Sequence, residues 1–182
     1  MPARDREYIK QEVIDGVIYD MSPSADYRHG IINGNIHHKI KSGLKNSLCL
    51  VFMENLDYKY SKSDDYVIPD IMVTCDRKNL KGGSYSGVPK FIVETLSPAT
   101  ALKDRTVKKD IYESCGIEEY WIVSPKEQAV EIYELVDGKY KLMYNYILED
   151  DIDSEYYNAK LEITLKAFPI TMTLEEIFEN VK

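Results

Sequence analysis

Three residues of the sequence could together carry out metal-assisted hydrolysis. Asp70 follows a proline in the run IPDI, Glu94 interrupts the apolar run FIVETL, and Lys108 lies in the charged segment that follows. Two carboxylates from neighbouring strands can share Mg²⁺, which takes oxygen ligands and also binds phosphate oxygens. A lysine beside them can stabilise the charge that develops on phosphorus. The trio therefore predicts hydrolysis of a phosphodiester.

Each of the three residues also has a purely structural interpretation. An aspartate after a proline is typical of a turn, and Glu94 could pair with a core lysine or arginine, because an unpaired charge in a buried strand is costly. Lys108 could form only an i,i+4 ion pair with Asp104, worth about 0.3 to 0.5 kcal/mol. The functional interpretation depends on the three residues occurring together.

The elements that must position these residues form a strand, a helix and a second strand. The run 91–96 predicts a buried strand, 102–115 a helix, and EYWIVS at 119–124 another strand. These lengths suit a βαβ crossover, which favours an α/β protein with a mixed sheet and flanking helices. In the helix, Val107, Ile111 and Cys115 mark the buried side. Lys108 then adjoins that side and shares a face with Tyr112, whereas Lys109, about 100° further round, faces solvent.

The remaining pattern predicts two hairpins, two further helices and several strands. Asp15-Gly16 and Asp137-Gly138 are strong hairpin signals. Ile32, Ile36, Ile40 and Leu44 recur at helical spacing, and His29 and Asn33 lie on another face of that helix. The Ser22-Pro23-Ser24 stretch predicts a break before it, and Thr173 predicts a helix cap. The expected elements are a hairpin in 11–21, a helix over 28–45, and strands over 48–53, 56–60 and 67–74.

Composition and charge limit the class of protein. The 182 residues predict one domain spanning 1–182, and no apolar run approaches the roughly 20 residues of a membrane span. A net charge of -8 argues against a coat that binds nucleic acid indiscriminately, although the 28–45 helix is basic. The N-terminus lacks the apolar core of a secretory signal, and the three cysteines form no C-x-x-C pair. A reducing cytoplasm is therefore expected, without structural zinc.

Several segments together resemble a known family. The runs IPDIMV, VPKFIVETLSPAT, DRTVKKDIY and GIEEYWIV, with MSP at 21–23 and His29 shortly after it, are similar to the Uma-two family. Its members are small bacterial restriction-endonuclease-like proteins of the PD-(D/E)XK nuclease superfamily. The resemblance covers most of the chain, and the block from ETLSPAT to EYW is its most specific part. It implies a restriction-endonuclease-like fold and a Mg²⁺-dependent nuclease site.

The resemblance also implies roles for particular residues. In the superfamily's usual motif the lysine lies two residues after the second acid, where this chain has Leu96. The family pattern places the lysine in the following helix, at Lys108. It further implies that Asp70 and Glu94 hold the metal, with the backbone carbonyl of Thr95 as an additional ligand. An acid from the first helix is often present too, but residues 28–45 contain none.

Other residues could stand near this site. Glu12 and Asp26 are weak substitutes for the absent helix acid, and His29 could contact phosphate, assist proton transfer or simply hydrogen-bond a neighbouring loop. The expected reaction is hydrolysis of DNA by a water activated at Mg²⁺, with Mn²⁺ as a substitute. A homodimer is expected because so small a domain rarely grips both strands of a duplex.

Two other function classes compete with this interpretation. One is a catalytically inactive module that retains the nuclease fold for nucleic-acid binding or assembly, which the negative charge and the absent helix acid favour. The other is a glycosidase with two carboxylates, which needs a cleft with aromatic walls. The 15 tyrosines are scattered through expected strands and therefore favour sheet packing over such a cleft.

Overall fold

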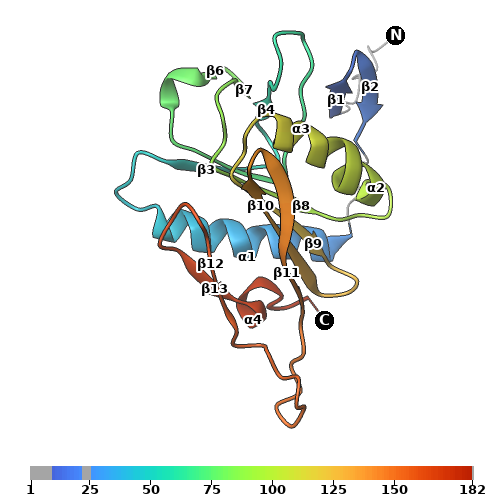
Figure 1. The fold of residues 1–182 in the computed structure, drawn as a ribbon, viewed down its shortest axis with the longest axis vertical. Helices are drawn as coiled ribbons and strands as arrows, with labels where there is room; N and C mark the ends of the chain where they lie inside the picture. Colours follow the sequence, from blue (N-terminus) through green and yellow to red (C-terminus); the bar gives the residue numbers. More distant parts are fainter. Residues whose placement is uncertain (1–9, 22–25, 182) are drawn as a thin grey trace, which may run out of the picture.

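A computed structural model describes residues 10–21 and 26–181, and its centre is a six-stranded mixed sheet (Figure 1). The strand order is β11-β10-β9-β8-β5-β3, with β8 and β9 parallel and each other pair antiparallel. Helices lie against both faces, which confirms the α/β class. The six strands are β3 (Leu50–Met53), β5 (Ile71–Thr74), β8 (Phe91–Thr95), β9 (Glu119–Ser124), β10 (Ala129–Val136) and β11 (Lys139–Ile147).

The expected βαβ crossover joins the two parallel strands at the centre of the sheet. Each residue of β8 and β9 is buried, because elements cover this part of the sheet on both sides. The connection is helical throughout but not uniformly α-helical. It consists of α2 (Ala101–Lys103), the π-helical turn η2 (Asp104–Lys108) and α3 (Lys109–Ser114).

One face of the sheet is covered by α1 (Tyr27–Gly43) and α4 (Leu174–Ile177). The predicted isoleucine stripe of α1 is confirmed, since Ile32, Ile36 and Ile40 are completely buried against the sheet. The carboxylate of Asp26 caps the start of α1 by accepting from the Arg28 amide. Thr173 caps α4 as expected, and the short strands β12 (Glu162–Thr164) and β13 (Thr171–Thr173) complete this layer.

The opposite face carries the crossover helices and the N-terminal hairpin (Figure 1). Asp15 and Gly16 have the positive φ angles of a tight hairpin turn, so the first hairpin is confirmed. Backbone hydrogen bonds of 2.9 Å in both directions between Val13 and Tyr66 attach it to the body. The elements of this layer are β1 (Gln11–Ile14), β2 (Val17–Asp20), β4 (Asp57–Tyr58), η1 (Arg77–Asn79), β6 (Leu80–Lys81) and β7 (Ser84–Tyr85).

Three of the expected strands are clearly shorter than predicted, among them the strand expected over 48–53, which is Leu50–Met53, and one expectation lies outside the described residues. The strand expected over 67–74 begins only at Ile71, because Pro69 has no N–H to donate to a ladder. The strand expected over 56–60 is reduced to Asp57–Tyr58. The hairpin at Asp137-Gly138 is confirmed, with β11 as the outer strand. The break at 22–24 falls in the undescribed stretch.

A disulfide bond joins Cys49 to Cys75, a pairing that the sequence does not predict. The two cysteines continue the antiparallel register of β3 and β5, in which Leu50 lies opposite Thr74, while Cys115 is a free thiol. In the described part of the chain, no helix is both long and apolar enough to cross a membrane.

The disulfide yields a prediction about stability. Replacing Cys49 and Cys75 together by serine should lower the free energy of unfolding by about 2 to 4 kcal/mol in oxidising buffer, because the bond closes a 26-residue separation. Urea denaturation with and without reductant measures the loss. The Cys115→Ser variant is the control and should match the wild type. Equal stability of the double variant and the oxidised wild type would contradict the prediction.

Candidate active site

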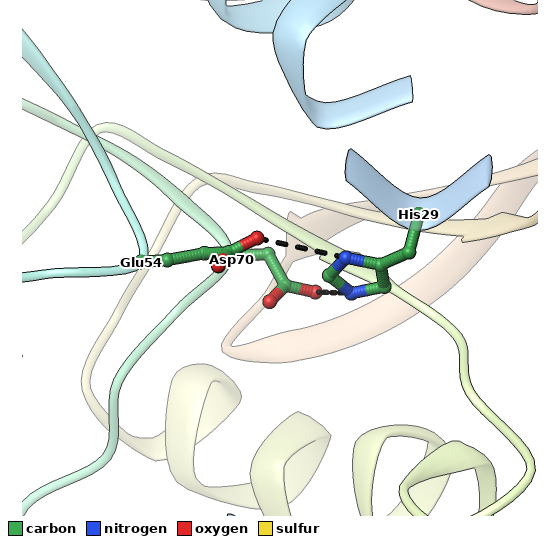
Figure 2. Close-up of side chains that lie close together, drawn as sticks. All are labelled: His29, Glu54 and Asp70. Atoms are coloured by element: carbon green, nitrogen blue, oxygen red, sulfur yellow. Dashed lines mark hydrogen bonds and ion pairs between the residues drawn. The ribbon is translucent and has the colours of Figure 1, made fainter. Parts of the chain in front are cut away.

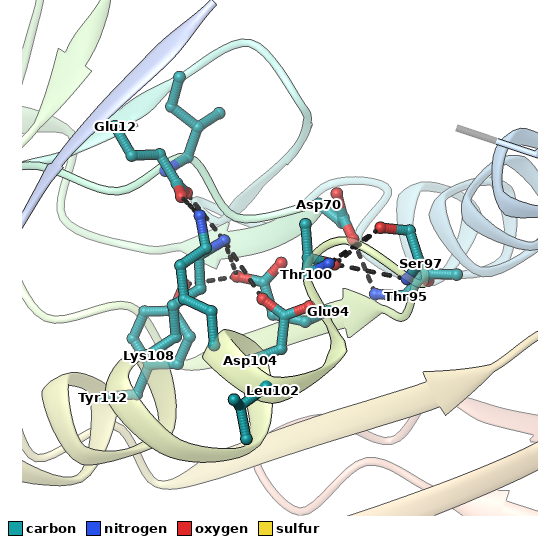
Figure 3. Close-up of polar contacts among 12 residues, drawn as sticks. Glu12, Asp70, Glu94, Thr95, Ser97, Thr100, Leu102, Asp104, Lys108 and Tyr112 are labelled. Carbon is teal, nitrogen blue, oxygen red and sulfur yellow. Dashed lines mark hydrogen bonds and ion pairs between the residues drawn. The ribbon is translucent and has the colours of Figure 1, made fainter. Parts of the chain in front are cut away.

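The sheet places Asp70 and Glu94 on the same face. Ile71 of β5 lies opposite Val93 of β8, so one further step of the antiparallel register sets Asp70 opposite Glu94. The Thr95 amide donates to Oδ2 of Asp70 at 2.7 Å and so connects the two strand ends (Figure 3). Asp70 is 7% exposed and Glu94 2% exposed. The structure therefore brings together the two carboxylates that the sequence singles out.

Lys108 is the cation that compensates Glu94. Its Nζ lies 3.0 Å from Oε1 of Glu94, 2.8 Å from Oε1 of Glu12 and 3.7 Å from Oδ1 of Asp104. The hydroxyl of Tyr112 donates to the same Glu94 oxygen at 2.5 Å. Lys108 is only 2% exposed, so its ammonium group is inside the protein and surrounded by carboxylates (Figure 3). Lys108 and Tyr112 share a helix face, as predicted.

The prediction that Val107, Ile111 and Cys115 form the buried side of the crossover helix is wrong. Val107 is 40% exposed, and Ile111 and Cys115 are only partly buried. The buried side consists of Asp104, Lys108 and Tyr112 instead, and the turn between the first two is π-helical. Carboxylates beneath the helix make burial of a lysine favourable there, an effect that a pattern of apolar residues does not reveal.

Lys109 is not fully in solvent as predicted. Its side chain is partly buried, and its Nζ lies 4.4 Å from the centre of the Tyr133 ring on β10. Such a contact is a cation–π interaction, worth about 0.5 to 1 kcal/mol when exposed. Adjacent lysines of one helix therefore have different surroundings: an aromatic ring for Lys109 and a cluster of carboxylates for Lys108.

Of the two weak substitutes for an acid in the first helix, Glu12 lies in the site and Asp26 lies outside it. Glu12 on β1 is completely buried and joins the cluster, where it contacts both Lys108 and Lys103. Asp26 caps α1 at the surface and pairs with Arg28, so it takes no part in the site. A long-range partner such as Glu12 leaves no local signal in the sequence beyond its acidic character.

His29 connects Asp70 to a further acid, Glu54 (Figure 2). Its Nε2 lies 3.1 Å from Oδ2 of Asp70 and its Nδ1 3.5 Å from Oε1 of Glu54, while Asn33 donates to Glu54 at 2.8 Å. One ligand atom from each of the three titratable residues lies within 4.8 Å of the others. Glu54 and Asn33 were not predicted as site residues, although Asn33 follows His29 by one helical turn. Thr95 also reaches this group, because its hydroxyl donates to Asn33 at 2.6 Å.

Burial and charge oppose each other throughout the site. Burial raises the pKa of the Glu94 carboxyl well above its usual range; the charge of Lys108 opposes that rise, and the carboxylates of Asp70 and Asp104 add to it. Burial alone would lower the pKa of Lys108, but Glu94, Glu12 and Asp104 hold it well above its usual range. Lys108 is therefore protonated at neutral pH, and the carboxylates around it disfavour more negative charge.

The same competition acts on His29. Burial alone would lower the pKa of its imidazole, but the hydrogen bond and charge of Asp70, followed by the charge of Glu54, raise it. Nε2 of the ring hydrogen-bonds Asp70, while Nδ1 lies 3.2 Å from the amide nitrogen of Asn33 and 3.5 Å from Glu54, so that a carboxylate stands near each ring nitrogen.

Comparisons with known proteins identify the fold and the family. A crystal structure titled as a "putative nuclease belonging to DUF820" from Anabaena variabilis ATCC 29413 superposes with a TM-score of 0.71 and 18% identity, covering 94% of this chain and 91% of that one. The fold is therefore nuclease-like. The family model Uma2, described as "Putative restriction endonuclease", matches residues 1–165, and the chain belongs to this family. The uncharacterized protein slr1290 of Synechocystis sp. is 27% identical over 150 residues, covering 82% of this chain and 78% of that protein.

The contacts of Lys108 yield a prediction about stability. Lys108→Met should lower the free energy of unfolding by about 3 to 5 kcal/mol, because it leaves buried carboxylates without their shared cation. Lys109→Met removes a charge from the next position and should cost about 1 kcal/mol or less. Urea denaturation of both variants at pH 7 tests the difference. Similar losses would show that Lys108 does not hold the cluster together.

Proposed function

We propose that this protein is a metal-dependent endonuclease that hydrolyses phosphodiester bonds in DNA, with Asp70, Glu94 and Lys108 as its catalytic residues. The observation that carries the proposal is the burial of Lys108 against Glu94 at the strand end that faces Asp70. An acid pair with an adjoining lysine is the set that stabilises charge on a phosphorus centre. Membership of the Uma2 family supports the same reaction class.

A divalent cation suits the residues around Asp70 and Glu94. Three buried carboxylates, those of Glu12, Glu94 and Asp104, lie within 4 Å of one buried ammonium group, and among the described residues Oδ1 of Asp104 has no hydrogen-bond partner. Carboxylates and a backbone carbonyl are the oxygen donors that Mg²⁺ prefers. We assign Asp70, Glu94 and the carbonyl of Thr95 as ligands of Mg²⁺, with Mn²⁺ as a substitute. Bound there, the ion would polarise the phosphate and lower the pKa of a water molecule.

The chain's own residues account for orientation and charge stabilisation. Asp70 is held by the Thr95 amide and by His29, and Glu94 by the Tyr112 hydroxyl. The ammonium group of Lys108 has three donors, of which two reach Glu12 and Glu94. The distance from Nζ to Oδ1 of Asp104 is 3.7 Å, beyond hydrogen-bond distance, so the third donor would be the one to reach a phosphate oxygen in the transition state.

Further parts of the proposal concern partners and location. The basic helix α1 approaches the DNA backbone, where its exposed Lys41 can contact phosphates. The chain forms one domain and pairs as a homodimer through the outer strand β11, where Leu142 and Tyr144 are 51% and 48% exposed. We place the protein in the cytoplasm, although a disulfide such as Cys49–Cys75 is uncommon in that compartment.

Metal binding gives the first test of this function. Millimolar Mn²⁺ or Mg²⁺ should raise the melting temperature, because a ligand that binds only the folded state stabilises it. Glu94→Gln should abolish the rise, whereas Glu119→Gln, at another buried acid of the same sheet, should retain it. Thermal unfolding monitored with and without metal measures both. An unchanged melting temperature in the wild type would favour an inactive nucleic-acid-binding or assembly module.

Cleavage gives the second test. With Mn²⁺ and a mixed DNA substrate, Lys108→Ala should lose about 10²-fold or more in rate, the size expected when one charge-stabilising donor is removed. Lys109→Ala should cleave at nearly the wild-type rate, since its ammonium group contacts Tyr133 instead. Gel-based rates and DNA affinities separate the outcomes. Equal losses that follow weakened binding would make both lysines phosphate anchors and remove the catalytic role of Lys108.

A further inference from the structure

Glu12 reaches the site from the start of the chain and is completely buried there. Its Oε1 accepts from Nζ of Lys108 at 2.8 Å and from the Ile68 amide at 3.0 Å, and its Oε2 pairs with Lys103. One carboxylate therefore joins three separate elements: the N-terminal hairpin, the crossover helix and the segment that leads into Asp70. Burial alone would raise the pKa of Glu12, but the charge of Lys108 and the hydrogen bond from Lys103 hold that pKa below its usual range.

The contacts of Glu12 differ from those of a metal ligand. Both oxygens already accept from protein donors, so three of about four lone-pair positions are taken. Figure 3 shows the ammonium group of Lys108 between Glu12 and Glu94, with Asp70 on the far side of Glu94. Glu12 is thus separated from the proposed ion by the lysine that it contacts.

The hairpin holds Glu12 firmly in this place. Val13 exchanges two backbone hydrogen bonds with Tyr66, the Gly16 amide donates to Asp65 at 2.9 Å, and Ile14 is 3% exposed in the core. These contacts follow Glu12 directly in the chain. They fix the backbone that carries the carboxylate, whereas the outer strand β2 is exposed along its length.

We propose that Glu12 is a positioning residue that holds the ammonium group of Lys108 in its catalytic place and is not a ligand of the metal. This inference rests on the proposed nuclease function. Without Glu12, Lys108 keeps one close acceptor, Glu94, which is also a proposed metal ligand. Glu12 therefore sets the direction of the lysine, and the N-terminal hairpin becomes a part of the active site.

The test compares Glu12→Gln with a matched control. Glutamine has nearly the same shape but lacks the charge and places an N–H group against the lysines. The control Glu119→Gln makes the same change at a buried acid on β9, which binds the Trp121 indole and the Lys166 amide. Glu12→Asp, which keeps the charge but is one methylene shorter, serves as a second variant if Glu12→Gln does not fold.

Two measurements distinguish positioning from ligation and from a structural role. With Mn²⁺ and DNA, Glu12→Gln should lower kcat about 10- to 100-fold, which is the range for residues that orient a ligand or catalytic group. The KM for DNA and the dissociation constant of Mn²⁺ should stay within about twofold of the wild-type values. NMR of ¹⁵N-labelled lysine ammonium groups should show a protected Lys108 signal, assigned by its loss in Lys108→Met. That signal should broaden or shift in Glu12→Gln and stay unchanged in Glu119→Gln.

The outcomes separate this inference from the proposed function. A large loss of Mn²⁺ affinity in Glu12→Gln would make Glu12 a ligand and overturn the inference, as would an unchanged Lys108 signal with unchanged kcat. A wild type that does not cleave DNA, but whose Lys108 signal responds to Glu12→Gln, would overturn the nuclease function and still support the placement of Lys108 by Glu12.

Discussion

The burial of one ammonium group, that of Lys108, is the constraint on which the site depends. A charged group removed from water costs several kcal/mol unless close partners of opposite charge surround it. Glu94 and Glu12 provide those partners at 3.0 and 2.8 Å. They come from the central sheet and from the N-terminal hairpin, so the sheet, the hairpin and the crossover helix must all be in place together. The polar cluster thus selects one arrangement of these elements.

Much of the site could be predicted because the sequence contains a local conflict. An acid inside the apolar run FIVETL requires compensation, and the helix directly after that strand is the nearest source of a cation. Asp70 could be paired with Glu94 because both lie in expected strands, 67–74 and 91–96, that could be neighbours in one sheet. Glu12 could be named only as a weak candidate and Glu54 not at all, since each meets its partner through a tertiary contact. Neither has a spacing relation to that partner.

The errors in the fold have a similar origin. The two hairpins follow from Asp-Gly turns, which act locally, and both are confirmed, whereas the strand expected over 56–60 is reduced to Asp57–Tyr58. The face of the crossover helix was predicted from apolar residues, and Val107 is exposed because charged partners decide that face. The bond between Cys49 and Cys75 depends on the register of β3 against β5, which the separate strand patterns do not contain.

The π-helical turn between Asp104 and Lys108 has a consequence for how such sites vary among relatives. A π turn holds one residue more than an α-helical turn and so changes the rotation of the helix that follows. A relative with an uninterrupted α-helix would need its lysine one position earlier to present the ammonium group to the same carboxylates. The ammonium group would then occupy the same place in both proteins. The number of residues between the strand acid and the lysine would differ by one.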